Sequence, residues 1–252
     1  MGGSLQVSLR DGVLTLTLDR PDKRNALDSP LIDALHHELE RAELDADVRV
    51  VVLGGAGKDF CAGADLEELL ASADRSPGEN EASALRLGSL FVRMRRMQKP
   101  VVAKVQGRAL AGGAGLVTAC DIAVAGAGAQ LGYPEIQRGF VPAMVMSLLR
   151  RVTGEKTALE LVLTGRVLSA EEARAVGLLA RVVPDTELDR EVEGLARGLA
   201  DSSLTAVALT KHLFYQLDDT PLDDGVTLGA RVNAFARATP ACREAIARFL
   251  KK

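Results

Sequence analysis

Two glycine-rich turns are the segments of this 252-residue chain best suited to chemistry. The first is Phe60–Asp65 (FCAGAD), and the second runs from Gly107 to Gly115 and contains Gly112-Gly113. Each leads into a predicted helix, whose N-terminus presents unpaired N–H groups and the positive end of the helix dipole. The turns could therefore hold a negatively charged oxygen. They could equally be tight turns whose glycines only permit positive φ, and the residues alone leave both interpretations open.

Other candidate motifs lack a residue that their chemistry requires. Lys58 in Gly55-Ala-Gly-Lys58 is followed by Asp59, where a phosphate-binding loop needs Ser or Thr. Gly126-Ala-Gly128 lacks the third glycine of a dinucleotide site, and no G-x-S-x-G elbow is present. Cys61 has no His nearby in the sequence, so a small buried side chain is expected rather than a nucleophile. Three scattered cysteines and three histidines predict neither a disulfide framework nor a zinc site.

Composition narrows the class of protein. Apolar residues make up 47% and charged residues 26%, which is typical of a globular protein. The net charge of −3 and the 3% of aromatic residues argue against a nucleic-acid partner. The first residues lack the pattern of a signal peptide, and the most apolar stretch, 109–120, is too short and too rich in glycine to span a membrane. We therefore expect a cytoplasmic protein with no membrane partner.

The elements that would position the two turns alternate between strands and helices. Strands are predicted over 5–9, 13–18, 48–53, 101–105, 122–125, 129–132 and 178–183. After Pro184 the pattern is helical. The sequence thus predicts an α/β core over residues 1–190, followed by a helical region over 191–252.

Three local signals predict where helices begin. Ser29 followed by Pro30 predicts an N-cap and a first helical position. Ser169–Glu172 (SAEE) predicts a capping box, with Gly177 ending that helix. Residues 71–80 are polar and contain Pro77-Gly78, so they are predicted to form a mobile insertion before a helix over 81–97.

A series of ordered motifs resembles one known family. These motifs are Arg20–Leu27 (RPDKRNAL), Phe60–Asp65 (FCAGAD), Lys99–Ala103 (KPVVA), Gly107–Gly113 (GRALAGG), Cys120-Asp121, Gly132–Ile136 (GYPEI), Leu163–Gly165 (LTG) and Ala175–Leu178 (AVGL). Together they resemble the crotonase superfamily of enoyl-CoA hydratases and isomerases, over about residues 5–250. The resemblance implies an α/β, crotonase-like core of repeated ββα units with a C-terminal helical trimerisation region. It also implies homotrimers that often pair into hexamers.

The resemblance assigns the two turns to an oxyanion hole. The backbone N–H groups of Ala64 and Gly112 would hold the thioester oxygen of an acyl-CoA while an enolate forms, as donors placed where charge develops. Asp65 would cap the helix that follows Ala64. The remaining substrate contacts implied by the resemblance are Lys23, Arg24, Ala26, Ala62, Gly63, Leu66 and Gly113.

The catalytic carboxylates are where the sequence departs from the family pattern. Typical hydratases use two Glu residues, and only the second has a counterpart here, Glu135 in Tyr133-Pro134-Glu135. The first would fall at position 115, which is Gly115. Tyr133 and Arg138 are possible helpers of Glu135, and Tyr133, Pro134 and Gly115 are expected to contact the substrate. Because glycine removes a side chain, extra volume for a bulkier or branched acyl chain is also expected at 115.

Three functions follow from this pattern. The first is an enoyl-CoA hydratase-like lyase that uses Glu135 as its only acid/base carboxylate. The second is an enoyl-CoA Δ3,Δ2-isomerase in which the same Glu135 moves a proton between two carbons. The third is a catalytically weak protein that binds CoA esters, or RNA, although the charge argues against RNA. No metal and no cofactor beyond the coenzyme A of the substrate is expected, and the acyl group stays open.

Overall fold

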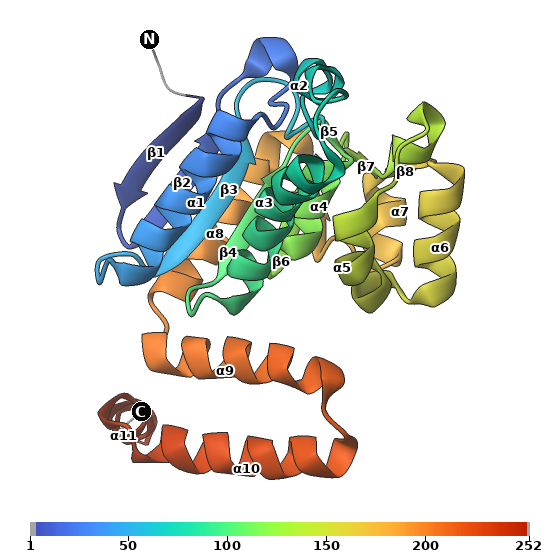
Figure 1. Cartoon of the computed structure of the whole chain (residues 1–252). Coiled ribbons are helices and arrows are strands. Elements are labelled where there is room, and N and C mark those ends of the chain that lie inside the picture. Colours follow the sequence, from blue (N-terminus) through green and yellow to red (C-terminus); the bar gives the residue numbers. More distant parts are fainter. Residues whose placement is uncertain (1–3, 251–252) are drawn as a thin grey trace.

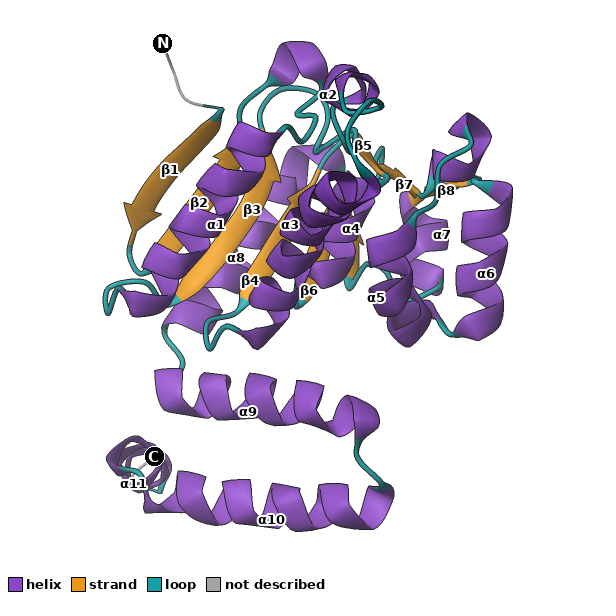
Figure 2. Cartoon of the chain, in the orientation of Figure 1, coloured by secondary structure: helices purple, strands orange, loops and turns teal. Residues whose placement is uncertain are grey.

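The computed structural model describes residues 4–250 of the chain (Figures 1 and 2). Its strands are β1 (Leu5–Arg10), β2 (Val13–Leu18), β3 (Val50–Gly55), β4 (Val101–Val105), β5 (Arg108–Leu110), β6 (Ile122–Gly126), β7 (Gln130–Gly132), β8 (Val167–Ser169) and β9 (Arg181–Val183). Its α-helices are α1 (Ser29–Leu44), α2 (Leu66–Ala71), α3 (Pro77–Arg96), α4 (Gly112–Ala119), α5 (Ala143–Thr153), α6 (Glu155–Thr164), α7 (Ala170–Ala175), α8 (Leu188–Ala200), α9 (Leu204–Gln216), α10 (Leu222–Ala238) and α11 (Pro240–Phe249). Short 3₁₀ turns η1 (Pro21–Lys23), η2 (Pro134–Arg138), η3 (Asp185–Glu187) and η4 (Leu217–Asp219) complete the elements. The predicted α/β class is confirmed.

The larger sheet has helices on both faces, and its central strand β3 is buried on both sides. Its order is β1-β2-β3-β4-β6-β9, parallel except for the β1–β2 hairpin. Alternate residues of a strand point to opposite faces, so Val51 and Leu53 join the main core while Val50 and Val52 face α8. Figure 1 shows α1 and α3 in front of this sheet and α8 behind it. The domain boundary expected at 190/191 falls inside α8.

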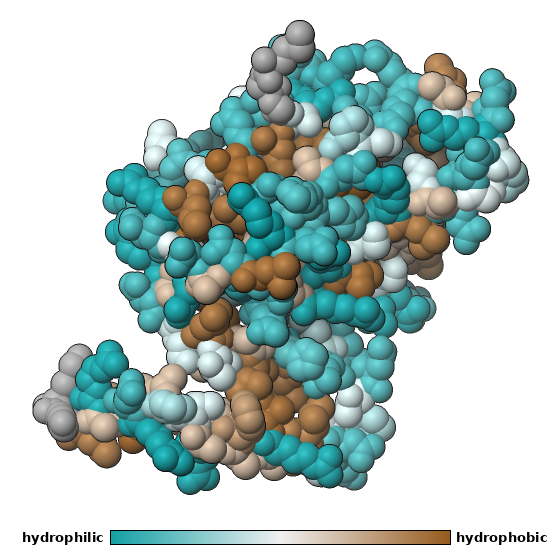
Figure 3. All heavy atoms as spheres, turned by 60° about the vertical axis from the view of Figure 1, so that its left-hand side comes forward, coloured by the Kyte–Doolittle hydropathy of each residue, from teal (hydrophilic) through white to brown (hydrophobic). Residues whose placement is uncertain are grey.

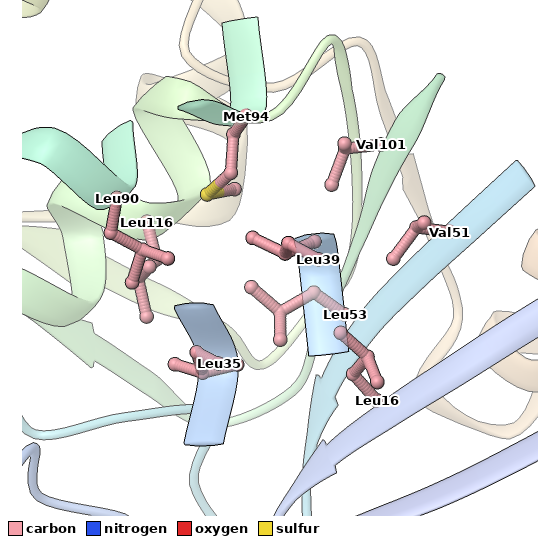
Figure 4. A pocket seen from close by; sticks show the side chains of 9 residues that line it. All are labelled: Leu16, Leu35, Leu39, Val51, Leu53, Leu90, Met94, Val101 and Leu116. Carbon is pink, nitrogen blue, oxygen red and sulfur yellow. The ribbon is translucent and has the colours of Figure 1, made fainter. Parts of the chain in front are cut away.

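The main core is continuous and closely packed. Figure 4 shows its centre, where nine apolar side chains from both the sheet and the helices converge. They are Leu16, Leu35, Leu39, Val51, Leu53, Leu90, Met94, Val101 and Leu116. No space large enough for a water molecule remains between them, as expected of a well-packed interior. These nine side chains therefore form part of the core, and no ligand could bind between them.

A second, small sheet carries the glycine-rich turns. It has the order β5-β7-β8, with β5 and β7 parallel and Leu110 opposite Gly132. The sequence predicted β7 but not β5, which has only three residues. Because parallel strands end at the same edge, the residues that follow β5 and β7 lie side by side there.

The C-terminal helices α9, α10 and α11 extend away from the sheet (Figure 1). These helices, and the residues that directly follow α9 and α11, carry large apolar side chains that are exposed: Phe214, Leu217, Leu222, Val226, Phe235, Ile246, Phe249 and Leu250. Figure 3 shows apolar side chains gathered over this lower part of the molecule. Across residues 4–250, no helix has the length and apolar character needed to cross a membrane.

The predicted N-termini of two helices, α1 and α3, are wrong. The N-cap of α1 is Asp28, whose carboxylate accepts the N–H of Leu31, and Ser29 instead bonds to Glu68 of α2. Residues 77–80 are not an insertion, because α3 begins at Pro77 behind a capping box made by Ser76 and Glu79. The capping box predicted at Ser169 is confirmed.

Candidate active site

Three backbone segments meet at one edge of the small sheet. Cys61 forms a bridge with Ala109, donating to the carbonyl of Arg108 at 3.0 Å and accepting from the N–H of Leu110 at 2.9 Å. On the other side of β5, the N–H of Ala111 donates to the carbonyl of Gly132 at 2.8 Å. The turn after Cys61, the turn after β5 and the turn after β7 therefore lie next to one another.

The two N–H groups predicted for an oxyanion hole are brought together at this edge. A Cβ built on Gly112 would lie 3.8 Å from the nitrogen of Ala64, and one built on Gly63 would lie 3.3 Å from the nitrogen of Gly112. Within residues 4–250, no acceptor receives either N–H. Both residues are partly exposed.

Glycine is required at two positions for this approach. Gly63 has φ +97°, and a Cβ there would lie 2.7 Å from the Cβ of Ala111. A Cβ on Gly113 would lie 2.3 Å from the carbonyl oxygen of Cys61. Ala62 lies on the same turn, partly exposed, and its N–H bonds to the carbonyl of Arg24.

Ala111, just before Gly112, holds an unusual backbone conformation. Its φ is +51° and its ψ is −123°, a region that side chains disfavour. Non-glycine residues in such regions cost about 1–3 kcal/mol and collect at functional sites. The ψ of Ala111 sets the orientation of the peptide N–H of Gly112 at the start of α4.

Asp65 caps α2, as predicted, and is tied to the loop after the first hairpin. Its carboxylate accepts the N–H groups of Glu67 and Glu68, and the Arg20 guanidinium binds it at 2.8 Å. The hydrogen bond from Arg20 is the main reason why the pKa of Asp65 is lowered. Leu66 begins α2 and is 55% exposed, so it lies at the surface beside Ala64.

The predicted contacts on the loop after β2 lie at the surface near α2. Lys23 is exposed and pairs with Glu67 at 2.6 Å, which raises the pKa of Lys23. Arg24 is exposed, with φ +50°. Ala26 is buried, and its carbonyl accepts the Arg20 guanidinium. Fully buried Asn25 donates to the carbonyls of Ala56, Asp59 and Phe60 and so anchors the loop.

Glu135 follows β7 at the same edge, within η2. Its Oε2 is buried, and among the described residues no donor reaches that oxygen. Burial raises the pKa of Glu135 above its ordinary value, while the charge of Arg138 opposes the rise. An unpartnered carboxylate oxygen with a raised pKa is suited to taking up and returning a proton.

Tyr133 and Pro134 stand behind Glu135 in the core. Tyr133 is fully buried, and its hydroxyl lies 2.6 Å from Oγ1 of Thr118 on α4. Burial raises the pKa of Tyr133, so its hydroxyl stays neutral. Pro134 is buried at the start of η2. The Tyr133–Thr118 contact ties the Glu135 turn to α4, a partner that sequence motifs do not reveal.

Gly115 does not free space for an acyl chain, contrary to the expectation from its size. A Cβ on Gly115 would lie 2.7 Å from Cζ of Phe91 on α3 and 3.2 Å from its Cε2. Phe91 is 2% exposed. The aromatic ring therefore fills the place that a side chain at 115 would take, and this residue was not predicted from the sequence.

Cys61 is fully buried, as expected of a small core residue. Burial raises the pKa of its thiol to about 12. The thiol is therefore neutral and is not a nucleophile.

Comparison with known proteins gives the family. The sequence profile of the enoyl-CoA hydratase/isomerase family matches residues 8–252. A Thermus thermophilus protein with a provisional enoyl-CoA hydratase name is 42% identical over 240 residues, covering 95% of each chain. The 2,3-dehydroadipyl-CoA hydratase of Escherichia coli is 36% identical over 251 residues, covering 98% of this chain and 96% of the relative. The crystal structure of an enoyl-CoA hydratase from Mycobacterium smegmatis superimposes with a TM-score of 0.95 at 34% identity, covering 99% of this chain and 97% of that one.

The chain therefore belongs to the enoyl-CoA hydratase/isomerase family, and it is an enzyme of that family. The resemblance found in its ordered motifs is confirmed, as is the crotonase fold.

Proposed function

We propose that this enzyme is an enoyl-CoA hydratase-like lyase in which Glu135 is the only acid/base carboxylate. The observation that carries the proposal is that the buried Oε2 of Glu135 receives no donor from residues 4–250, at the same sheet edge where the N–H groups of Ala64 and Gly112 have no acceptor among those residues. The thioester oxygen would accept both N–H groups, and these donors would stabilise the enolate. Loss of one such donor in other enzymes lowers kcat by about 10²–10³-fold.

In this reaction Glu135 handles the proton that enters or leaves the acyl chain. The oxygen of water bonds to the β-carbon of a 2-enoyl-CoA, while Glu135 takes a proton from that water and gives a proton to the α-carbon. The product is a 3-hydroxyacyl-CoA, and Glu135 ends the step ionised as it began. Lys23 and Arg24 are proposed to meet the phosphates of coenzyme A, because they are the exposed cations on the loop that borders Ala62. Coenzyme A enters as part of the substrate, and the chemistry requires no metal.

A second candidate function is supported by the contact between Gly115 and Phe91. An aromatic ring there supplies no second base that could activate water. Double-bond migration needs no water, so one carboxylate at 135 could deprotonate the α-carbon of a 3-enoyl-CoA and reprotonate its γ-carbon, which gives a 2-enoyl-CoA. If the enzyme catalyses neither reaction, the third function remains, a catalytically weak protein that binds CoA esters.

One assay separates these functions. The purified enzyme and its Glu135→Gln variant are incubated with 2-enoyl-CoA and 3-enoyl-CoA thioesters in deuterated water, and the products are analysed by mass spectrometry and NMR. Hydration gives a 3-hydroxyacyl product, whereas isomerisation gives only a moved double bond. Full activity in Glu135→Gln would refute the proposed role of Glu135. Tight binding to immobilised coenzyme A with no turnover would support the binder.

We also propose that the exposed apolar side chains of α9–α11 are covered by other copies of the chain, in a homotrimer or a dimer of trimers. Exposed patches of this kind mark association surfaces. Light scattering after size-exclusion chromatography tests it. A monomer at micromolar concentration would contradict it.

A further inference from the structure

Helix α3 forms a wall along one face of α4. Residues 112 and 115 are three apart and so share a face, separated by about 4.5 Å along the helix axis. A Cβ on Gly112 would lie 3.3 Å from Cδ2 of Leu87, and a Cβ on Gly115 would lie 2.7 Å from Cζ of Phe91. Leu87 and Phe91 are themselves one helical turn apart on α3. The two pairs therefore define a wall that runs from the oxyanion donor inward.

Exposure falls along this wall. Gly112 and Ala64 are partly exposed, Leu87 is 8% exposed, Gly115 is buried and Phe91 is 2% exposed. Along the glycine face of α4, Leu87 thus flanks the position beside the two N–H groups, and the Phe91 ring lies one helical turn further in, against Gly115. The three atoms nearest to a Cβ built on Gly115 all belong to the Phe91 ring. The ring therefore occupies the position next to Gly115.

We propose that Phe91 is a specificity-determining residue that ends the acyl pocket and limits the enzyme to short, unbranched acyl chains. The proposal rests on the proposed function only for the placement of the thioester oxygen at Ala64 and Gly112. With that oxygen fixed and the α-carbon near Glu135, the remaining carbons extend along the α3–α4 wall until they reach the ring.

The test compares Phe91→Ala and the milder Phe91→Leu with wild type on a series of straight-chain enoyl-CoA thioesters of increasing length. One methylene in an apolar pocket commonly changes kcat/KM by about 10-fold or more. We expect the ratio of kcat/KM for long over short chains to rise at least about tenfold in Phe91→Leu, and further in Phe91→Ala. Val92→Ala, on the exposed side of the same helix, is the matched control and should leave the ratio unchanged. An unchanged ratio in both Phe91 variants, with folded protein by circular dichroism, would overturn the proposal.

Substitution at the other side of the contact separates specificity from packing. Gly115→Ala places a methyl group against the ring, so we expect a lower Tm and a lower kcat/KM that is most marked for the longest accepted chain. Phe91→Leu combined with Gly115→Ala should recover the Tm. If Phe91 only packs the core, Tm will respond and the chain-length ratio will not, which would refute the proposal.

A binding experiment tests the role of Phe91 even if the proposed enzymatic function is wrong. If the wild type turns over no enoyl-CoA, calorimetric titration with saturated acyl-CoA thioesters of the same lengths still reports on Phe91. Affinity that falls with chain length in wild type but not in Phe91→Leu would support the pocket limit without any turnover. Equal dependence on length in both proteins would reject it.

Discussion

The Glu135→Gln substitution removes the ionisable group of the candidate site while keeping its size, and we expect it to have opposite effects on activity and on stability. A positioned acid or base contributes about 10²–10⁴-fold to a rate. Loss of that factor corresponds to about 2.7–5.4 kcal/mol of transition-state stabilisation. We therefore expect kcat to fall by at least about 10²-fold, with a smaller change in KM.

Stability should change in the other direction at neutral pH. The buried Oε2 has no donor among the described residues, and a buried polar atom without a partner costs about 1–3 kcal/mol. Glutamine carries no charge, so it avoids the larger part of this cost. We expect Glu135→Gln to raise the free energy of unfolding by about 1 kcal/mol at pH 7.

The pH dependence follows from the raised pKa of Glu135. Between the pKa of the unfolded chain, about 4.3, and the higher pKa of the folded protein, the native state binds more protons. Wild-type stability therefore falls as pH rises through this window, whereas the variant lacks this contribution. The advantage of Glu135→Gln should appear above the folded pKa and disappear below about pH 4. The activity of the wild type should fall as pH drops through the same raised pKa, because the base must be ionised.

Urea denaturation at pH 4 to 8, together with kcat and KM over the same range, provides the measurements. Glu81→Gln on the exposed part of α3 is the matched control for loss of one carboxylate. A variant that is less stable than wild type at every pH would show that the carboxylate has a stabilising partner. That result, or unchanged kcat, would refute the reasoning.

Three further predictions concern the buried ion pair of α9 and two residues of the candidate site. Lys211→Met should lower the free energy of unfolding, measured by urea denaturation, by about 2–3 kcal/mol. The substitution breaks the buried ion pair between Lys211 and Asp121, 2.7 Å apart, that attaches α9 to the core. A loss below about 0.5 kcal/mol would contradict this prediction. Ala111→Gly should raise the free energy of unfolding by about 1 kcal/mol, because glycine adopts a φ of +51° without strain. It should lower kcat, because a more flexible backbone orients the Gly112 N–H less well. A less stable variant would argue against strain at Ala111. Lys23→Ala should raise KM about two- to fivefold with kcat unchanged, an effect that fades at high salt, since the cation is exposed; a loss of kcat would place Lys23 closer to the chemistry.

Features set by neighbouring residues could be predicted from the sequence. Asp11-Gly12 predicts the first hairpin, and Ser169–Glu172 predicts a capping box, because both depend on contacts within a few residues. The start of α1 was missed by one residue. Ser29 and Asp28 are both good N-caps, and the choice between them depends on Glu68, which draws the Ser29 hydroxyl to α2.

The same limit applies to residues 71–80. Their polarity and Pro77-Gly78 favour a loop by composition, yet Pro is well suited to the first turn of a helix. Ser76 and Glu79 complete a capping box there, which overrides the composition. Composition over ten residues carried less information than two residues at the right spacing.

The motifs predict site roles for the N–H groups of Ala64 and Gly112 and for Glu135, but they do not predict which side chains surround these groups. Phe91 lies 24 positions before Gly115, and no spacing rule links an aromatic residue on one helix to a glycine on another. The sequence shows that a carboxylate is missing at 115, and from this we expected empty volume. Close packing predicts otherwise, since a buried void is costly and a neighbouring side chain tends to fill it. The Phe91 ring fills it here.

Two residues of the candidate site are expected to lower the free energy of unfolding, and each lies next to a contact that restricts its movement. Ala111 keeps a strained φ, and the buried Oε2 of Glu135 receives no donor from the part of the chain that the structure describes. Each lies beside a backbone or core contact that leaves it little freedom: Ala111 bonds to Gly132, and Tyr133 anchors the Glu135 turn to α4. Strain persists only where the surrounding structure over-determines it, so these anchors should be more stabilising than the strained residues are destabilising. Tyr133→Phe tests this. It removes only the hydroxyl that contacts Thr118, so we expect a loss of about 1–3 kcal/mol in unfolding free energy and a fall in kcat through displacement of Glu135. A stable variant with wild-type kcat would show that the turn is held by other contacts.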